Sequence, residues 1–201
     1  YKNTFRGLKS DTLTKLNWGF LKNYKHPLNT FVFQAIIIPN DKGGILARAI
    51  EGTKKSNISP TGTTTVWRPT DNKILFVVEG AIDAASIAQA TDFQYGVIAI
   101  GGTSGIKHCV ERLTELYPNG SDTLKIIVML DHDSDDPEKD SGQVAAQKLV
   151  AELKQLGFAV VNKIICEEPR RDPNLILQEE GDEALRNRIE SIVADSQSKF
   201  V

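Results

Sequence analysis

The chain has 201 residues, with 24 Lys and Arg, 26 Asp and Glu, and a formal net charge of −2. This length allows a buried core in one domain or two small ones, and the charge balance argues against a generic nucleic-acid binder. The two cysteines, Cys109 and Cys166, and the three scattered histidines lack zinc-ligand spacing, and no apolar run is long enough to span a membrane. The sequence therefore predicts a cytoplasmic protein without zinc and without a membrane partner. Because its first residues read as mid-sequence, we expect a segment of a longer protein.

Charge is distributed unevenly along the chain. Residues 1–70 carry 11 Lys and Arg against 3 Asp and Glu, whereas residues 71–201 carry 13 against 23. Such an asymmetry indicates a phosphate-binding half beside an acidic, metal-binding half. The alternative is that both halves are simply solvated surfaces.

The first 70 residues predict a small basic α+β unit. Residues 1–24 favour helix, with Ser10 or Asp11 as the cap and an end near Trp18 and Gly19. Apolar runs at residues 31–39 and 45–50, joined by a Gly-containing turn, indicate a hairpin, and a polar loop is expected from residue 54 to residue 62.

From residue 74 onward, short apolar runs alternate with helical patterns. Strands are expected at residues 74–78, 97–100, 124–130 and 158–165, with helices at residues 81–90, about 106–116, 142–156 and 182–194. Runs without polar alternation are typical of strands buried on both faces. The alternation therefore predicts an α/β fold with a parallel sheet and helices on both faces.

Carboxylates follow two of these predicted strands. Glu79 ends the first, with Gly80 next to it and Asp83 one helical turn later, and Asp131 and Asp133 end the third. Ligands in α/β folds bind at the carboxyl ends of strands, and adjacent carboxylates repel each other unless a cation or proton lies between them. Oxygen ligands suit Mg²⁺, Mn²⁺ or Ca²⁺.

Three simpler interpretations stay open beside this metal site. The acidic loop after residue 131 can be merely solvated. Asp172, followed by Pro173, can be only the N-cap of a helix. The loop at residues 101–105, rich in glycine, can either cradle a phosphate or simply turn tightly.

Glu79-Gly80 with Asp83, followed by Asp131-x-Asp133, resembles the Toprim domain of bacterial-type (DnaG-like) primases, topoisomerases, OLD-family nucleases and recombination proteins. The flanking segments are similar to the catalytic core of the primases among these, and extend the resemblance to nearly the whole chain. They are Arg6-Gly7-Leu8, Asn17-Trp18-Gly19-Phe20, Arg48, Lys55-Ser56-Asn57 and Asp172-Pro173-Asn174.

Three features depart from that family pattern. Residues 134–141 form a longer and more acidic segment, and Asn174 stands where the family has a second aspartate, which predicts a weaker late metal site. The chain is also short for a cellular primase core, which favours a phage, plasmid or mobile-element version.

The resemblance implies a Toprim-like parallel sheet over residues 71–201, preceded by a basic α+β subdomain over residues 1–70. It implies RNA primer synthesis from ribonucleoside triphosphates on single-stranded DNA, a nucleotidyl transfer that uses Mg²⁺ or Mn²⁺, with a replicative helicase as a further partner. Two alternatives remain: a nuclease or topoisomerase built on the Toprim scaffold, and a catalytically silent nucleic-acid-binding module that supports a helicase.

The site residues that the resemblance implies fall into two groups. Asp131, Asp133 and Asp172 are the first metal ligands; Glu79 is either a further ligand or the general base, and Asp83 completes the acidic rim. The groups that hold template or triphosphate are Arg48, Lys54, Lys55 and Asn57.

Overall fold

The computed structural model describes residues 4–27, 32–53, 55–67 and 73–200, and Lys54 lies outside them. Its helices are α1 (Ser10–Lys15), α2 (Ala81–Ala90), α3 (Ile106–Leu116), α4 (Ser141–Gln155), α5 (Pro173–Glu180) and α6 (Asp182–Gln197), with a 3-10 turn at Thr103–Gly105. Its strands are β1 (Thr4–Phe5), β2 (Leu8–Lys9), β3 (Gly19–Lys25), β4 (Val32–Pro39), β5 (Ile45–Ala49), β6 (Lys55–Ile58), β7 (Thr64–Trp67), β8 (Ile74–Val78), β9 (Gly96–Ala99), β10 (Ser121–Val128) and β11 (Phe158–Asn162).

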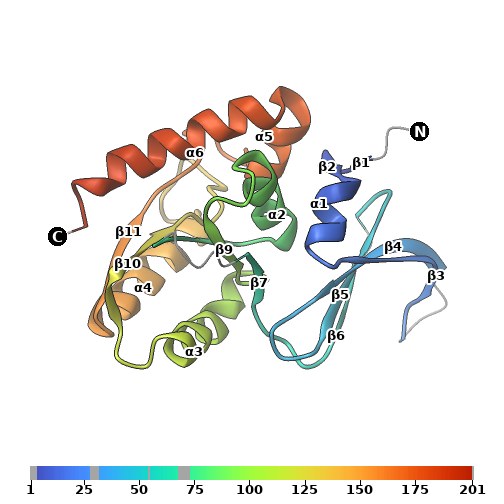
Figure 1. The fold of residues 1–201 in the computed structure, drawn as a ribbon, viewed down its shortest axis with the longest axis horizontal. Coiled ribbons are helices and arrows are strands. Elements are labelled where there is room, and N and C mark those ends of the chain that lie inside the picture. Colours follow the sequence, from blue (N-terminus) through green and yellow to red (C-terminus); the bar gives the residue numbers. More distant parts are fainter. Residues whose placement is uncertain (1–3, 28–31, 54, 68–72, 201) are drawn as a thin grey trace.

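The larger sheet has the strand order β11-β10-β8-β9-β7. Its strands run parallel except β7, which pairs antiparallel with β9. Alternate residues of β8 face opposite cores: Phe76 and Val78 pack with α2, α5 and α6, while Leu75 and Val77 pack with α3 and α4. Figure 1 shows these two groups of helices on opposite sides of the sheet. The predicted α/β class, with helices flanking a parallel sheet, is confirmed.

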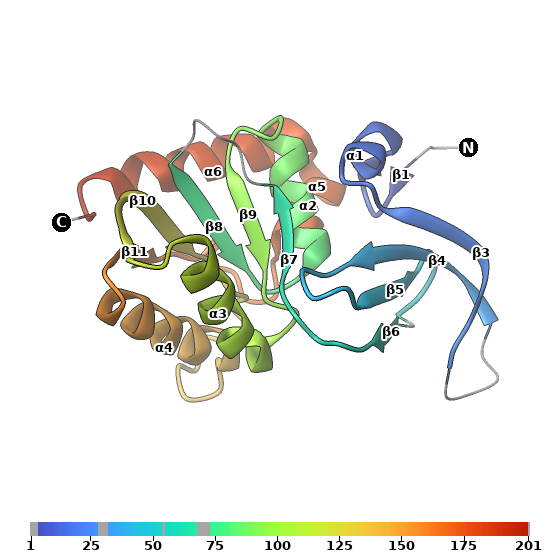
Figure 2. The same ribbon diagram turned by 60° about the horizontal axis from the view of Figure 1, so that its bottom comes forward.

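The smaller sheet is antiparallel, in the order β3-β4-β5-β6. It lies beside the larger sheet, next to the edge that β7 forms, with α1 and β1 above it in Figure 2. The division of the chain at residue 70 stays a prediction, since β7 precedes that residue and pairs within the larger sheet.

Three local predictions for the first half are wrong. Residues 19–25 form strand β3, although the helical pattern extended to residue 24, and residues 55–58 form β6 where a polar loop was expected. Both strands exist because β4 and β5 provide a hydrogen-bonding partner, which outweighs weak local propensity. Neither Ser10 nor Asp11 caps α1, whose N-cap is Lys9 without a side-chain hydrogen bond.

The two sheets are also tied together by polar contacts at one edge. The turn between β4 and β5 reaches α3, where Lys42 Nζ lies 2.6 Å from Glu111 Oε2 and Arg112 Nε lies 3.5 Å from Asp41 Oδ2. These pairs hold the turn against the helix. Within the described residues, no helix combines the length and apolar character needed to cross a membrane.

Candidate active site

A cavity of about 600 Å³ lies between the two sheets. One side, here called the carboxylate wall, contains side chains from the ends of β8 and β10 and from the starts of α2 and α5: Glu79, Asp83, Asp131 and Asp172. The opposite side, here called the cationic wall, contains Arg6, Arg48 and Lys55. The two walls meet because the carboxyl ends of β8 and β9 point toward the smaller sheet (Figure 2).

The structure brings most of the predicted site residues to this cavity. Asn57 lines it together with the predicted members of both walls. Asp133 instead lines an adjoining cavity of about 130 Å³, which shares Asp131 and Asp172 with the larger one and is also bordered by Arg171. Lys54 lies outside the described residues. Arg6 lines the main cavity although the sequence did not predict it as a site residue; its place in the Arg6-Gly7-Leu8 motif was the available signal.

Asp83 is held inside the carboxylate wall by its surroundings. Its side chain is only 9% exposed, and its Oδ1 accepts the backbone N–H of Asn174 at 3.2 Å. A Cβ on Gly80 would lie 2.3 Å from Asp83 Oδ2, so the carboxylate occupies space that only glycine leaves free. A larger residue at position 80 would therefore displace the Asp83 carboxylate from this place.

Burial and mutual repulsion raise the pKa values of three carboxylates in this wall, Glu79, Asp83 and Asp131. Burial, followed by the charges of Glu79, Asp172, Asp133 and Asp140, raises the pKa of Asp131 to about 7. Burial and then the charges of Asp172 and Asp131 raise the pKa of Asp83 well above its usual value. Burial and then Asp133 raise the pKa of Glu79, which Lys55 partly offsets. Without a cation, the wall favours retained protons.

The donor chemistry of this wall fits a hard divalent cation, because every candidate ligand is a carboxylate. The spacing is wider than that of a ready-made site: within the described ranges, no three His, Cys, Asp or Glu side chains are grouped closely enough to hold a metal ion. The fit therefore rests on the carboxylate oxygen donors that surround one cavity.

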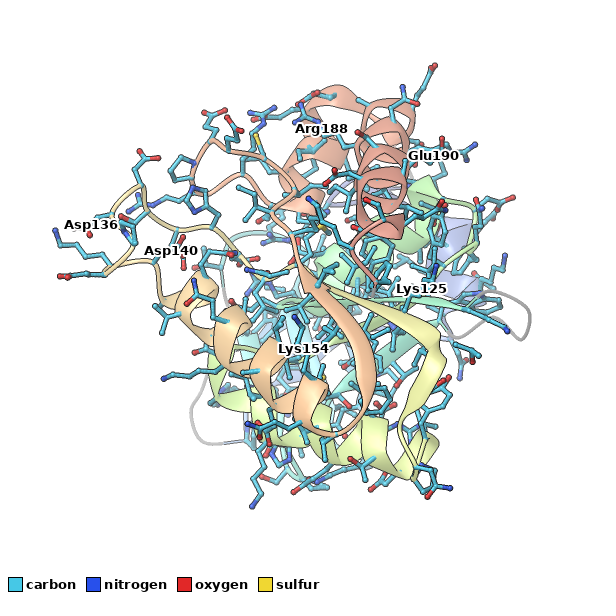
Figure 3. The ribbon with its side chains drawn as sticks, turned by 90° about the vertical axis from the view of Figure 1, so that its left-hand side faces the viewer. Lys125, Asp136, Asp140, Lys154, Arg188 and Glu190 are labelled. Carbon is cyan, nitrogen blue, oxygen red and sulfur yellow. The ribbon has the colours of Figure 1, made fainter. Side chains whose placement is uncertain are left out.

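The loop that carries Asp131 and Asp133 is fastened to the start of α4. Asp140, 2% exposed, is the N-cap of that helix; its Oδ1 accepts the N–H groups of Gln143 and Asp133, each at 3.2 Å. Its Oδ2 lies 2.5 Å from His132 Nδ1. Burial raises the pKa of Asp140, but these hydrogen bonds outweigh burial and lower it. Figure 3 shows Asp140 at the base of the loop and Asp136 farther out.

Two further contacts fix the backbone of the same loop. Gln143 Nε2 donates to the carbonyl oxygens of Leu130 and Asp131, at 3.0 and 3.2 Å, and Asn162 Nδ2 donates to Gln143 Oε1 at 2.9 Å. A Cβ on Gly142 would lie 2.1 Å from the Asp131 carbonyl oxygen. The acidic segment at residues 134–141 therefore folds back onto the start of α4. Its last aspartate, Asp140, holds the loop in place through the hydrogen bonds of its buried side chain.

Asp172 both caps a helix and borders the cavities, two features that the sequence presented as alternatives. Its Oδ1 accepts the N–H of Leu175 at 2.6 Å, which makes it the N-cap of α5 followed by Pro173. The same side chain also lines both cavities. The cap interpretation is thus correct, and the residue that forms the cap also borders both cavities.

Asn174 borders the main cavity, and its side chain is held by several hydrogen bonds within the protein. It is 5% exposed, its Nδ2 donates to the Arg6 carbonyl at 2.8 Å and to Ser86 Oγ at 3.0 Å, and its Oδ1 accepts from Gln178 Nε2 at 2.8 Å. The amide nitrogen supplies two hydrogen bonds that a carboxylate cannot. Asn174 is a structural link between the N-terminal turn, α2 and α5.

The two arginines of the cationic wall keep hydrogen-bonding capacity free. Arg6 Nη2 donates to the Gly52 carbonyl at 2.9 Å, and burial, then the charge of Arg6, lowers the pKa of Arg48 while Asp83 raises it. Considering the described part of the chain, the buried Nε atoms of both arginines have no hydrogen-bond partner. Buried guanidinium donors without partners suit an anionic ligand.

The glycine loop at residues 101–105 borders the same cavity. Gly101, Gly102 and Ser104 lie on its wall with His108, the first-turn histidine of α3. This position is compatible with a loop that cradles a phosphate and equally with a loop that only makes a tight turn. The described tyrosines Tyr24, Tyr95 and Tyr117 do not line either cavity.

Comparison with solved structures identifies the same fold in primase cores. The primase fragment of the bacteriophage T7 primase-helicase protein aligns with a TM-score of 0.57 at 21% identity, over 92% of this chain and 71% of that one. The E. coli primase catalytic core gives a TM-score of 0.57 at 16% identity, over 96% and 75%. A DnaG primase catalytic domain bound to single-stranded DNA gives 0.54 at 17% identity, over 96% and 73%.

Sequence comparisons complete this result. No curated protein matches the chain. The family model described as the Toprim domain matches residues 74–183, more than half of the chain, and this range contains β8, β10 and every residue of the carboxylate wall. The predicted resemblance to primase cores is confirmed at the level of the fold, and the chain belongs to the Toprim-domain family.

Proposed function

We propose that the chain is the catalytic core of a DnaG-like primase, a nucleotidyltransferase that joins ribonucleoside triphosphates into short RNA primers on single-stranded DNA. The observation that carries this proposal is the cavity in which a carboxylate wall faces a cationic wall. Nucleotidyl transfer needs both kinds of charge, because a hydroxyl attacks an α-phosphate while pyrophosphate leaves.

The carboxylate wall is the side at which chemistry would occur. Asp131, Asp133 and Asp172 would hold Mg²⁺ or Mn²⁺, which supplies charge stabilisation for the attacking hydroxyl and the leaving pyrophosphate. Glu79 would either join these ligands or accept the proton of the attacking hydroxyl, a role that its raised pKa favours. Asp83 completes the wall from its buried side.

The cationic wall would position the phosphates. Arg48 and Arg6 both line the cavity, and a guanidinium can bind two phosphate oxygens at once. Lys55 and Asn57 lie on the same side of the cavity. The DNA-bound DnaG domain among the structural neighbours supports a DNA template, and the T7 primase-helicase protein supports a helicase partner.

One assay tests the proposal. The chain is incubated with Mg²⁺ or Mn²⁺, single-stranded DNA and labelled ribonucleoside triphosphates, and the products are separated by length. Template-dependent oligoribonucleotides are expected. Asp131→Asn and Asp133→Asn should each abolish synthesis, while the circular dichroism spectrum stays unchanged and unfolding stays cooperative. Synthesis that persists in both variants would remove the metal-site assignment.

The same assay separates the alternatives. Cleavage of labelled DNA with metal but without nucleotides would favour a Toprim nuclease, and binding without metal or synthesis would favour a silent supporting module. A topoisomerase needs a nucleophilic tyrosine, and none of the described tyrosines reaches the cavity.

A further inference from the structure

An aromatic side chain is exposed on the outer strand of the smaller sheet. Phe20, on β3, is 55% exposed and is the most exposed large apolar side chain among the described residues. Its neighbour Leu21 is 48% exposed. Single exposed apolar residues are ordinary, so the position of Phe20 on the sheet decides what it means.

The strand register places Phe20 on the same face as the cationic wall. Phe20 is opposite Ile36, Ile36 is opposite Arg48, and Arg48 is opposite Lys55. Side chains of directly opposed residues lie on one face of a sheet, so these four form a single row across the strands. Arg48 and Lys55 line the cavity, and Phe20 is at the outer end of their row.

Leu21 belongs to the opposite face. It is opposite Ala35, which in turn is opposite Ala49. Ala35 packs with Tyr24 and Ala47 in a separate small core on that side. Phe20 and Leu21 are therefore adjacent, similarly exposed and directed to different faces.

The surroundings of Phe20 are basic. Lys22 and Lys25 are exposed on the same strand, and Lys25 is opposite the exposed Val32. Neighbouring strands are roughly 4.8 Å apart, so the row from Phe20 to Lys55 spans roughly 14 Å, more than one nucleotide at 3.4 Å per step along a strand. An aromatic face among cations is complementary to a polyanion that carries flat bases.

We propose that Phe20 is a base-stacking platform for the single-stranded template, placed beyond the cationic wall on the same sheet face. A base leaves water to stack on the phenyl ring, while Arg48, Lys55 and Lys25 attract the phosphates of adjacent nucleotides. The inference rests on the proposed function and deepens it, because it names the strand entry side and a residue that recognises bases rather than phosphates.

Fluorescence anisotropy with the whole 201-residue chain tests this platform. The probes are a labelled single-stranded oligothymidylate and an oligonucleotide of equal length with abasic sites, both without metal. Phe20→Ala should weaken binding of the first probe about 5- to 100-fold, as expected for the loss of one base–aromatic stack. Phe20→Trp should retain binding, and Leu21→Ala, the matched control, should bind as the unchanged chain does.

Two further readouts separate stacking from charge. On the abasic probe the difference between the unchanged chain and Phe20→Ala should disappear. The slope of log affinity against log salt should be the same in both, because no phosphate contact is removed.

Four outcomes would overturn the platform. Equal effects of Phe20→Ala and Leu21→Ala, or an equal loss on the abasic probe, would reject stacking while leaving the proposed function in place. Unchanged DNA binding in Phe20→Ala, with altered self-association in sedimentation, would assign this surface to a protein contact. No binding of either probe by the unchanged chain would remove template binding itself and the proposed function with it.

Discussion

Asp131 has a pKa of about 7, because burial and the surrounding carboxylates disfavour its charge. An aspartate in an unfolded chain has a pKa of about 3.9, so the folded protein holds the Asp131 proton more tightly than the unfolded chain does. At this residue the free energy of unfolding therefore falls as pH rises from about 4 to about 7.

We expect Asp131→Asn to reduce that dependence on pH. The amide cannot ionise, so the variant should lose less stability than the unchanged chain between pH 5 and pH 8 and should be the more stable protein at pH 8. Urea unfolding at both pH values measures the difference. A variant that is equally destabilised at both pH values would show that Asp131 is not repelled by its neighbours.

Asn174 provides a second test at the scale of one residue. Replacing Asn174 with Asp removes both donors, to the Arg6 carbonyl and to Ser86 Oγ, and places a negative charge beside Asp83. An unsatisfied buried group costs about 1–3 kcal/mol, so Asn174→Asp should destabilise the protein by at least that amount.

This expectation reverses the interpretation of Asn174 as a weakened metal ligand. Urea unfolding reports the stability, and calorimetric titration with Mn²⁺ reports the affinity. Asp172→Ala is the comparison, with about 1 kcal/mol of lost stability from the missing cap and weaker Mn²⁺ binding. Tighter Mn²⁺ binding by Asn174→Asp, without loss of stability, would restore the ligand interpretation.

At the scale of elements, the N-terminus of α4 sets the shape of the acidic loop. Asp140→Ala removes the helix cap and the acceptor for the Asp133 amide, so we expect a loss of about 1–2 kcal/mol in the free energy of unfolding. Affinity for Mn²⁺ should also fall, because the backbone that directs Asp133 loses an anchor. Chemical denaturation and calorimetry measure the two effects.

The control for Asp140 lies in the same loop. Asp135 is exposed, so Asp135→Ala removes the same charge without a cap or an anchor. Asp140→Ser should recover much of the stability through its hydroxyl cap but not the contact with His132. Equal Mn²⁺ affinities in Asp135→Ala and Asp140→Ala would mean that Asp140 acts only through long-range charge.

Elements with strong local signals were predictable from the sequence, and those made by pairing were not. The apolar run at Ile74–Val78 and the Ala-rich helix Ala81–Ala90 have the predicted bounds. β3 and β6 were missed because their side chains are mostly exposed and polar or mixed, so no buried run marks them. Likewise, nothing local in Thr64–Trp67 indicates that it pairs with β9.

The candidate site likewise contains some residues that could be predicted from the sequence and others that could not. Glu79, Asp131 and Asp172 lie around one cavity because the carboxyl ends of parallel strands share an edge, which the order of elements already implied. The anchoring role of Asp140 was not visible, since it depends on how the inserted loop folds back onto α4. The partners of Asn174 are equally distant in sequence.

At the scale of the whole molecule, the uneven distribution of charge along the chain places the carboxylate wall and the cationic wall on opposite sides of one cavity. Lys55 is exposed at the cavity and forms no part of the hydrophobic core, so Lys55→Ala should leave the fold intact and weaken DNA binding alike for all sequences. If Lys55 neutralises one phosphate, the slope of log affinity against log salt should flatten by roughly 0.7. Anisotropy titrations at several salt concentrations measure it; a slope unchanged by the mutation would make Lys55 a solvated residue only.

The hydrogen bond from Asn174 to the Arg6 carbonyl joins residues 168 positions apart. During synthesis on a ribosome, Arg6 emerges well before Asn174, so the turn that carries Arg6 stays without this support until the 168 positions that separate the two residues have been made. Contacts between such distant segments form late, since a long loop must close first. A nascent or truncated chain that ends before α5 thus contains Glu79, Asp83, Asp131 and Asp133 but lacks the fastening of the cationic side, so the facing walls assemble only once α5 has been made.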